Sequence, residues 1–169
     1  EASFREYRPN AFIDGVATPG GTGGIHHALF NYLDDGDTAI TMDRYWAAYK
    51  SICREAGRNF DTFVMFDAEG NFNVQGCIDK LREYAGKQTN VFLIMNTPAN
   101  NPTGYNVKQN EWEAIMAELT AIANNGRNNV VLLMDIAYID FAAPECRKVF
   151  QLFNNLPENF LVLVSFSMS

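Results

Sequence analysis

Short apolar runs alternate with longer segments of mixed polarity along the whole chain. Each run is rich in Leu, Phe or β-branched residues and is bounded by Gly, Pro, Asn or Asp, which is typical of buried strands. The pattern predicts five strands, at residues 39–42, 62–66, 91–96, 130–135 and 161–165. It predicts helices between them, at about residues 22–32, 46–56, 74–85, 108–124 and 145–154.

This regular alternation indicates the fold class. Strands that are apolar throughout are buried on both faces, so we expect a three-layer αβα domain with a mostly parallel sheet covered by helices. The length of 169 residues suits one domain. In such domains ligands bind at the carboxyl ends of the strands, where the motifs below also fall.

Composition excludes several classes of function. The net charge of −7 does not resemble a nucleic-acid-binding footprint, and no apolar run is long enough to cross a membrane. The three cysteines, Cys53, Cys77 and Cys146, form no CxxC pair. The sequence therefore predicts neither a disulfide framework nor a zinc site, and it favours a reducing, cytoplasmic compartment.

The first segment with candidate chemistry is Gly-rich and opens a predicted helix. Gly20, Gly21 and Thr22 follow a short possible strand, and their backbone N–H groups suit an anion such as phosphate. The spacing matches neither the P-loop nor the dinucleotide-binding motif. Taken alone, the segment fits a phosphate cradle and a tight structural turn equally well.

Two polar segments follow predicted strands. Asn101 lies in a loop with two prolines, which either hold its amide toward a ligand or merely form a turn between two elements. Asp135 ends a strand of five apolar residues, and Tyr138 follows three positions later. A carboxylate at the end of a buried strand requires a partner.

Four motifs in order resemble the class I/II aminotransferases, within the fold-type I pyridoxal-phosphate (PLP) enzymes that include aspartate and aromatic aminotransferases. They are Gly-Gly-Thr-Gly at 20–23, Asn-Pro-Thr-Gly at 101–104, Asp-Ile-Ala-Tyr at 135–138 and Ser-Phe-Ser-Met-Ser at 165–169. The resemblance covers nearly the whole chain. It implies that residues 1–169 are the central part of the PLP-binding large domain, without the small domain and the N-terminal segment.

The resemblance also implies a role for each site residue. Asp135 pairs with the protonated pyridine nitrogen of the cofactor, so that the ring stays an electron sink. Tyr138 and Asn101 hydrogen-bond the phenolic oxygen of the ring. The remaining cofactor contacts are to the phosphate, from Gly20, Gly21, Thr22 and Ser167, and to the face of the ring, from Trp46. The alternative interpretation is that neither residue contacts a cofactor, and that Tyr138 is an ordinary half-buried tyrosine and Trp46 a core tryptophan. His26 and His27 match no catalytic position and are expected to pack or to face solvent.

The family's Schiff-base lysine has no counterpart in the sequence. By the resemblance it would follow Ser169 directly, and Lys108 and Lys148 lie in polar helical stretches instead. We therefore expect a full-length aminotransferase that exchanges amino groups between an amino acid and a 2-oxo acid, as a homodimer, and an inactive chain 1–169. The alternatives are a ligand-sensing domain of a transcription regulator, another PLP enzyme such as a lyase or synthase, and a structural domain without a ligand.

Overall fold

The computed structural model describes residues 12–166 and contains one five-stranded sheet with the strand order β2-β1-β3-β4-β5. All four strand pairings are parallel. The strands are β1 (Thr38–Met42), β2 (Asn59–Phe63), β3 (Asn90–Asn96), β4 (Asn129–Asp135) and β5 (Phe160–Ser165). This arrangement confirms the predicted parallel sheet.

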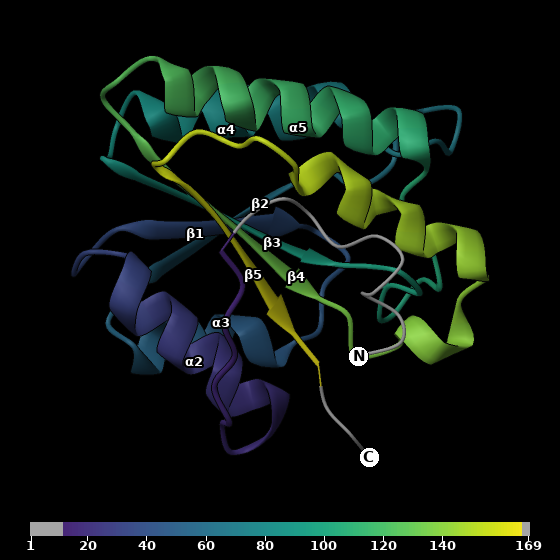
Figure 1. The fold of residues 1–169 in the computed structure, drawn as a ribbon, viewed down its shortest axis with the longest axis horizontal. Coiled ribbons are helices and arrows are strands. Elements are labelled where there is room, and N and C mark those ends of the chain that lie inside the picture. The colour runs from purple at the N-terminus through teal and green to yellow at the C-terminus, as the bar shows by residue number, and fades with distance from the viewer. Residues whose placement is uncertain (1–11, 167–169) are drawn as a thin grey trace.

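Helices cover both faces of the sheet, as predicted (Figure 1). One face packs against α2 (Gly20–Tyr32) and α3 (Ala48–Glu55). The other packs against α4 (Val74–Ala85), α5 (Gln109–Asn124) and the 3-10 helix η2 (Pro144–Phe153). Two apolar clusters fill the space between the sheet and the helices, one on each face. The central strands β3 and β4 lie between the two clusters, and every residue after the first in each of these strands is buried.

Three predicted elements differ from the structure. β2 begins three residues earlier than predicted, because its polar residues pair with β1 at the sheet edge, whereas Phe66 forms an isolated bridge with Phe72. The last helix is a 3-10 helix that begins at Pro144, rather than an α-helix. The possible strand before the Gly-rich segment does not lie within residues 12–18, which form neither helix nor strand.

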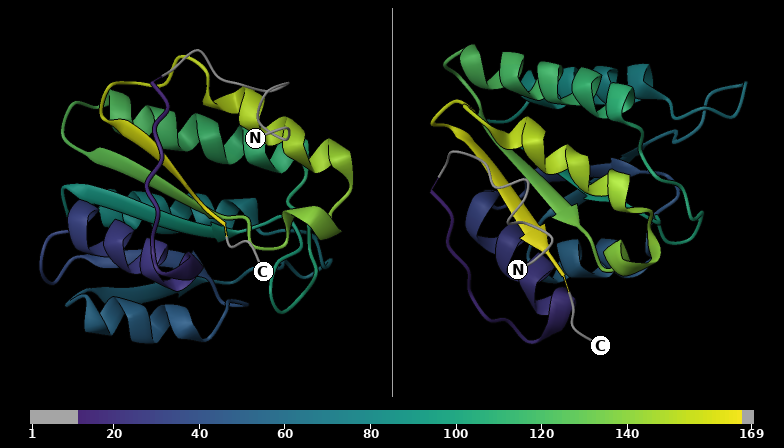
Figure 2. Two further views of the ribbon diagram at one scale, coloured as in Figure 1. Left: turned by 60° about the horizontal axis from the view of Figure 1, so that its bottom comes forward. Right: turned by 45° about the vertical axis from the view of Figure 1, so that its right-hand side comes forward.

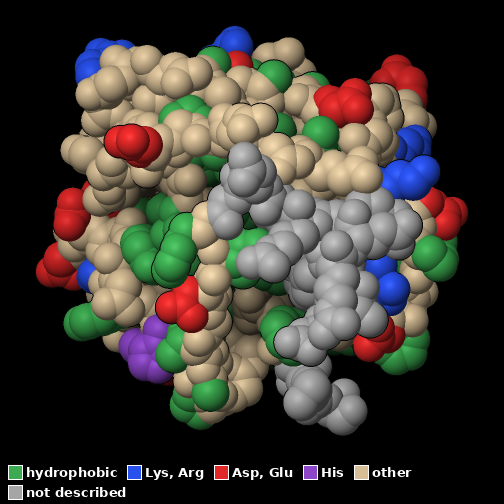
Figure 3. Space-filling view, in the orientation of Figure 1, with side chains coloured by type: hydrophobic (Ala, Val, Ile, Leu, Met, Phe, Trp, Pro, Cys, Tyr) green, Lys and Arg blue, Asp and Glu red, His purple; other side chains and the backbone are tan. Residues whose placement is uncertain are grey.

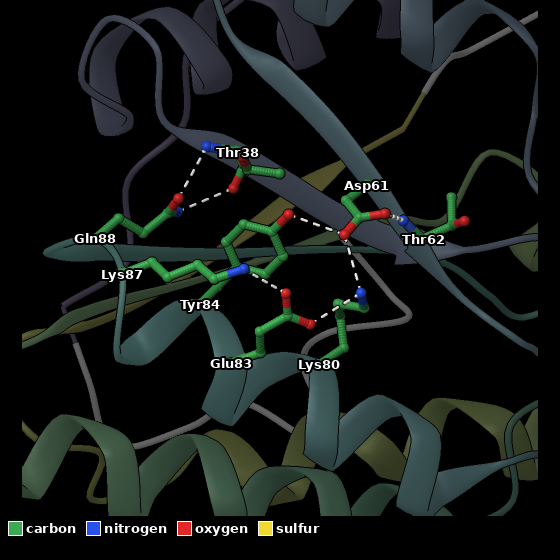
Figure 4. A network of polar contacts seen from close by, with 8 residues as sticks. All are labelled: Thr38, Asp61, Thr62, Lys80, Glu83, Tyr84, Lys87 and Gln88. Carbon is green, nitrogen blue, oxygen red and sulfur yellow. Dashed lines mark hydrogen bonds and ion pairs between the residues drawn. The ribbon is translucent and has the colours of Figure 1, made fainter.

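A polar network fastens the edge strand β2 to α4 (Figure 4). The carboxylate of Asp61 accepts hydrogen bonds from Lys80 Nζ at 2.9 Å and Tyr84 Oη at 2.8 Å. Partial burial favours the neutral acid, but these donors and the backbone N–H of Thr62 outweigh it and lower the pKa of Asp61. Gln88 exchanges two further bonds with the backbone of Thr38 in β1. The network therefore links α4 and the residues that follow it to the strands β1 and β2.

Within residues 12–166 the structure contains no helix with the length and apolar character that a bilayer-spanning segment requires. The same residues include no group of three or more His, Cys, Asp or Glu side chains that could hold a metal ion. All three cysteines are free thiols, as the cysteine spacing predicts.

Candidate functional site

The site lies at the carboxyl edge of the sheet, where three neighbouring strands end together. In the register of the sheet, Asp135 at the end of β4 is the partner of Asn96 in β3 and of Ser165 in β5. Figure 2 shows the start of α2 beside the end of β5. Ser165 Oγ lies 3.5 Å from the carbonyl oxygen of Gly21, which joins the Gly-rich segment to the same edge.

Asp135 is a buried carboxylate that is held by two donors. Its side chain accepts a hydrogen bond from Tyr49 Oη at 2.5 Å and one from the backbone N–H of Ala137 at 3.2 Å. Among the described residues no cation pairs with it. Burial raises the pKa of Asp135 above its usual range, although both hydrogen bonds act in the opposite direction. The group therefore suits a cationic N–H partner.

Tyr49 was not predicted as a site residue. It is fully buried in α3, and burial together with the adjacent carboxylate raises the pKa of its phenol, so the hydroxyl stays protonated and donates. Trp46 precedes α3 and its ring packs edge-on against Tyr49, with 5.7 Å between ring centroids. The only sequence signal for Tyr49 is its position three residues after Trp46.

Asn101 and Tyr138 lie together, as predicted. Asn101 Nδ2 donates to Tyr138 Oη across 3.2 Å, although 37 residues separate them in the sequence. They border an open hollow of about 300 Å³ that is lined by Ala99, Asn100, Asn101, Pro102, Tyr138 and Phe141. Tyr138 is 36% exposed, so its hydroxyl is available to a ligand in this hollow.

The Gly-rich segment opens α2 without a capping side chain. The N-cap residue is Pro19, whose side chain accepts no hydrogen bond from the first turn of the helix. The N–H groups of that turn are therefore not capped by the N-cap side chain. Gly20 has a φ of +70°, which favours glycine, and a Cβ at Gly23 would lie 2.7 Å from Pro19 Cδ. Thr22 is exposed beside these groups. This geometry suits an anion at the start of α2.

The structure places all but one of the other predicted residues. Ser167 lies outside the described residues. His26 stacks on Phe30 and His27 is exposed, as expected, and Figure 3 shows histidine at the surface over α2. Lys108 and Lys148 are exposed to solvent, as the polar helical pattern predicts.

Comparison with known proteins identifies the family. The family model described as aminotransferase class I and II matches residues 8–169. A solved aminotransferase from Anaerococcus prevotii is 41% identical, with a TM-score of 0.93 over 98% of this chain and 41% of that protein. An aromatic-amino-acid aminotransferase from Burkholderia pseudomallei, covalently bound to pyridoxal phosphate, shares the fold at 23% identity, with a TM-score of 0.70 over 98% of this chain and 42% of its own.

A curated relative extends the similarity. Histidinol-phosphate aminotransferase from Sulfurisphaera tokodaii is 22% identical over 82% of this chain and 36% of its own length. The chain thus spans between 36% and 42% of the length of these three relatives. With a family match over nearly all of its residues and a parallel sheet that carries the expected motifs at one edge, the chain belongs to the class I and II aminotransferase family.

Proposed function

We propose that this chain forms the central part of the cofactor-binding domain of a PLP-dependent aminotransferase that exchanges amino groups between an amino acid and a 2-oxo acid. The observation that carries the proposal is the buried carboxylate of Asp135, which has two donors and no cation among the described residues, close in sequence to a tyrosine at the open hollow. When bound, PLP supplies an electron sink for a carbanion at the α-carbon of the substrate.

The residues present fit that cofactor. Asp135 would hold the protonated ring nitrogen, because a buried carboxylate is stabilised by a cationic donor. Asn101 Nδ2 and Tyr138 Oη are two adjacent donors that would bind the phenolic oxygen. The uncapped start of α2, at Gly20, Gly21 and Thr22, would hold the phosphate.

Tyr49 and Trp46 would complete the site. Tyr49 keeps its proton and fixes one carboxylate oxygen of Asp135, so the other oxygen is oriented by the backbone alone. Trp46 packs edge-on against Tyr49 and would contact the face of the cofactor ring.

The proposal is tested by measuring the affinity of the chain for PLP from the absorbance of the bound cofactor. Asp135→Asn should weaken binding about 10- to 100-fold, because a charged hydrogen bond contributes about 1.5–3 kcal/mol. Asp61→Asn is the matched control, since it neutralises a carboxylate that faces α4 instead. Equal affinities of the two variants, or no binding by the unaltered chain, would contradict the proposal.

A further inference from the structure

One buried amide side chain joins the two halves of the proposed site. Asn96 is 1% exposed and ends β3, directly beside Asp135 in the sheet. Its Nδ2 donates to the backbone carbonyl of Asp135 at 3.0 Å, and its Oδ1 accepts the backbone N–H of Asn101 at 2.6 Å. One planar group therefore fixes the spacing between the residue assigned to the ring nitrogen and a residue assigned to the phenolic oxygen.

The side chain must be an amide for this purpose. The carbonyl of Asp135 accepts the backbone N–H of Thr97 at 3.2 Å and takes its side-chain donor from Asn96, whereas the N–H of Asn101 requires an acceptor. Asn supplies both the donor and the acceptor from one rigid group. Removing the acceptor would leave the part-buried N–H of Asn101 without this partner, at a cost of about 1–3 kcal/mol. Neither a carboxylate nor an aliphatic side chain of similar size would satisfy both.

A second buried asparagine supports the same loop. Asn100 is 2% exposed, and its Nδ2 donates to the carbonyl oxygens of Asn96 and Arg44, each at 3.2 Å. Its Oδ1 accepts the Thr103 hydroxyl at 2.7 Å. Arg44 lies two positions before Trp46, so Asn100 ties the segment carrying the tryptophan to the loop carrying Asn101. The loop is thus held from both sides, and Asn96 is its only side-chain link to Asp135 among the described residues.

We propose that Asn96 is a positioning residue that sets Asn101 relative to Asp135 and so matches the site to the width of the cofactor ring. Asn96 does not line the hollow and acts through its two neighbours. The inference rests on the proposed function for its consequence, but the placement of Asn101 can be measured without any cofactor.

The test compares the full chain with Asn96→Ala and with Asn128→Ala as the matched control. Asn128 is also a buried asparagine, 3% exposed, but it donates to the carbonyls of Ala85, Gln88 and Thr89 at the opposite edge of the sheet. Hydrogen exchange of the Asn101 amide, followed by NMR, should accelerate about tenfold or more in Asn96→Ala, because a lost bond of about 1.4 kcal/mol changes the rate tenfold. Asn128→Ala should change the exchange rate of the Asn101 amide less than twofold.

A second variant separates the two bonds and guards against a failure to fold. Asn96→Asp keeps the acceptor for Asn101 but loses the donor to Asp135, so the Asn101 amide should stay protected. The affinity for PLP should fall about tenfold in Asn96→Ala and remain within twofold in Asn128→Ala. Unchanged exchange in Asn96→Ala, or equal effects in the control, would overturn the inference. Absence of PLP binding by the unaltered chain would instead contradict the proposed function, and the exchange measurement would still decide the placement of Asn101.

Discussion

The contact between Tyr49 and Asp135 sets the electrostatics of the proposed site at the scale of single residues. Burial disfavours the charged form of both groups, so it raises the pKa of each. The hydrogen bond lowers the pKa of Asp135 again, because it stabilises the carboxylate. The hydrogen bond from Tyr49 therefore offsets part of the effect of burial on the pKa of Asp135.

Tyr49→Phe should consequently reduce stability in a pH-dependent manner. The variant removes one donor from a buried carboxylate, so the free energy of unfolding at pH 7 should fall by about 1–3 kcal/mol. Without the hydrogen bond, the pKa of Asp135 in the folded state rises further above its value in the unfolded chain. The variant therefore loses more stability than the unaltered chain as the pH increases through that folded-state pKa. Below about pH 4, where the carboxyl is protonated in the unfolded chain as well, the difference should shrink.

Urea unfolding at several pH values measures this effect. Tyr45→Phe serves as the control, since Tyr45 lies four residues before Tyr49 and packs its ring against Phe60, with 4.8 Å between ring centroids. The control should show a small change that does not depend on pH. A loss in Tyr49→Phe that is the same at pH 3 and pH 7 would show that the phenol only fills space.

The start of α2 is the feature that matters most at the scale of elements. Its first turn lacks a side-chain cap from Pro19, and the ring of Pro19 lies where a side chain at Gly23 would be. Gly23→Ala should therefore displace the proline ring or the first turn, and weaken the binding of inorganic phosphate several-fold. Isothermal titration would measure this, with Gly15→Ala as the control because nothing lies within 4 Å of its added Cβ. Equal phosphate binding by both variants would argue against an anion site at this helix.

The elements also show why the sequence predicts some features and not others. β3 and β4 were predicted to within one residue, because strands buried on both faces are apolar without interruption. β2 was displaced by three residues, because an edge strand carries polar residues such as Asn59 and Asp61 that periodicity does not assign to a sheet. Motif residues such as Asp135 and Asn101 were found by resemblance. Tyr49 and Asn96 were missed, because a buried hydrogen-bond partner has no sequence pattern of its own.

At the scale of the molecule, the strand order explains where the site lies. In the order β2-β1-β3-β4-β5, the chain adds β2 on one side of β1 and then β3, β4 and β5 on the other side. Ligands of open parallel sheets bind at such a switch point, which here lies between β1 and β3. Trp46 follows β1, Asn101 follows β3, and Asp135 ends β4, so the adjacent loops bring the three together. A chain with net charge −7 repels an anionic cofactor at long range, which leaves binding to local donors.

The distribution of lysines over the molecule leads to the last prediction. None of the five lysines of the chain lines the hollow. Lys80 pairs with Asp61 on β2 and with Glu83 on α4, and Lys87 pairs with Glu83. No lysine of this chain is therefore placed to hold a cofactor covalently beside Tyr138.

The chain should bind PLP and pyridoxamine phosphate with affinities that differ by less than about threefold. Pyridoxamine phosphate has no aldehyde, so a covalent link to a lysine would favour PLP alone. Each 1.4 kcal/mol from such a link would raise the affinity for PLP about tenfold. Dialysis should remove both ligands. Retention of one PLP per chain after borohydride reduction, on a single lysine, would contradict this prediction and would require a lysine to reach the hollow from its present position.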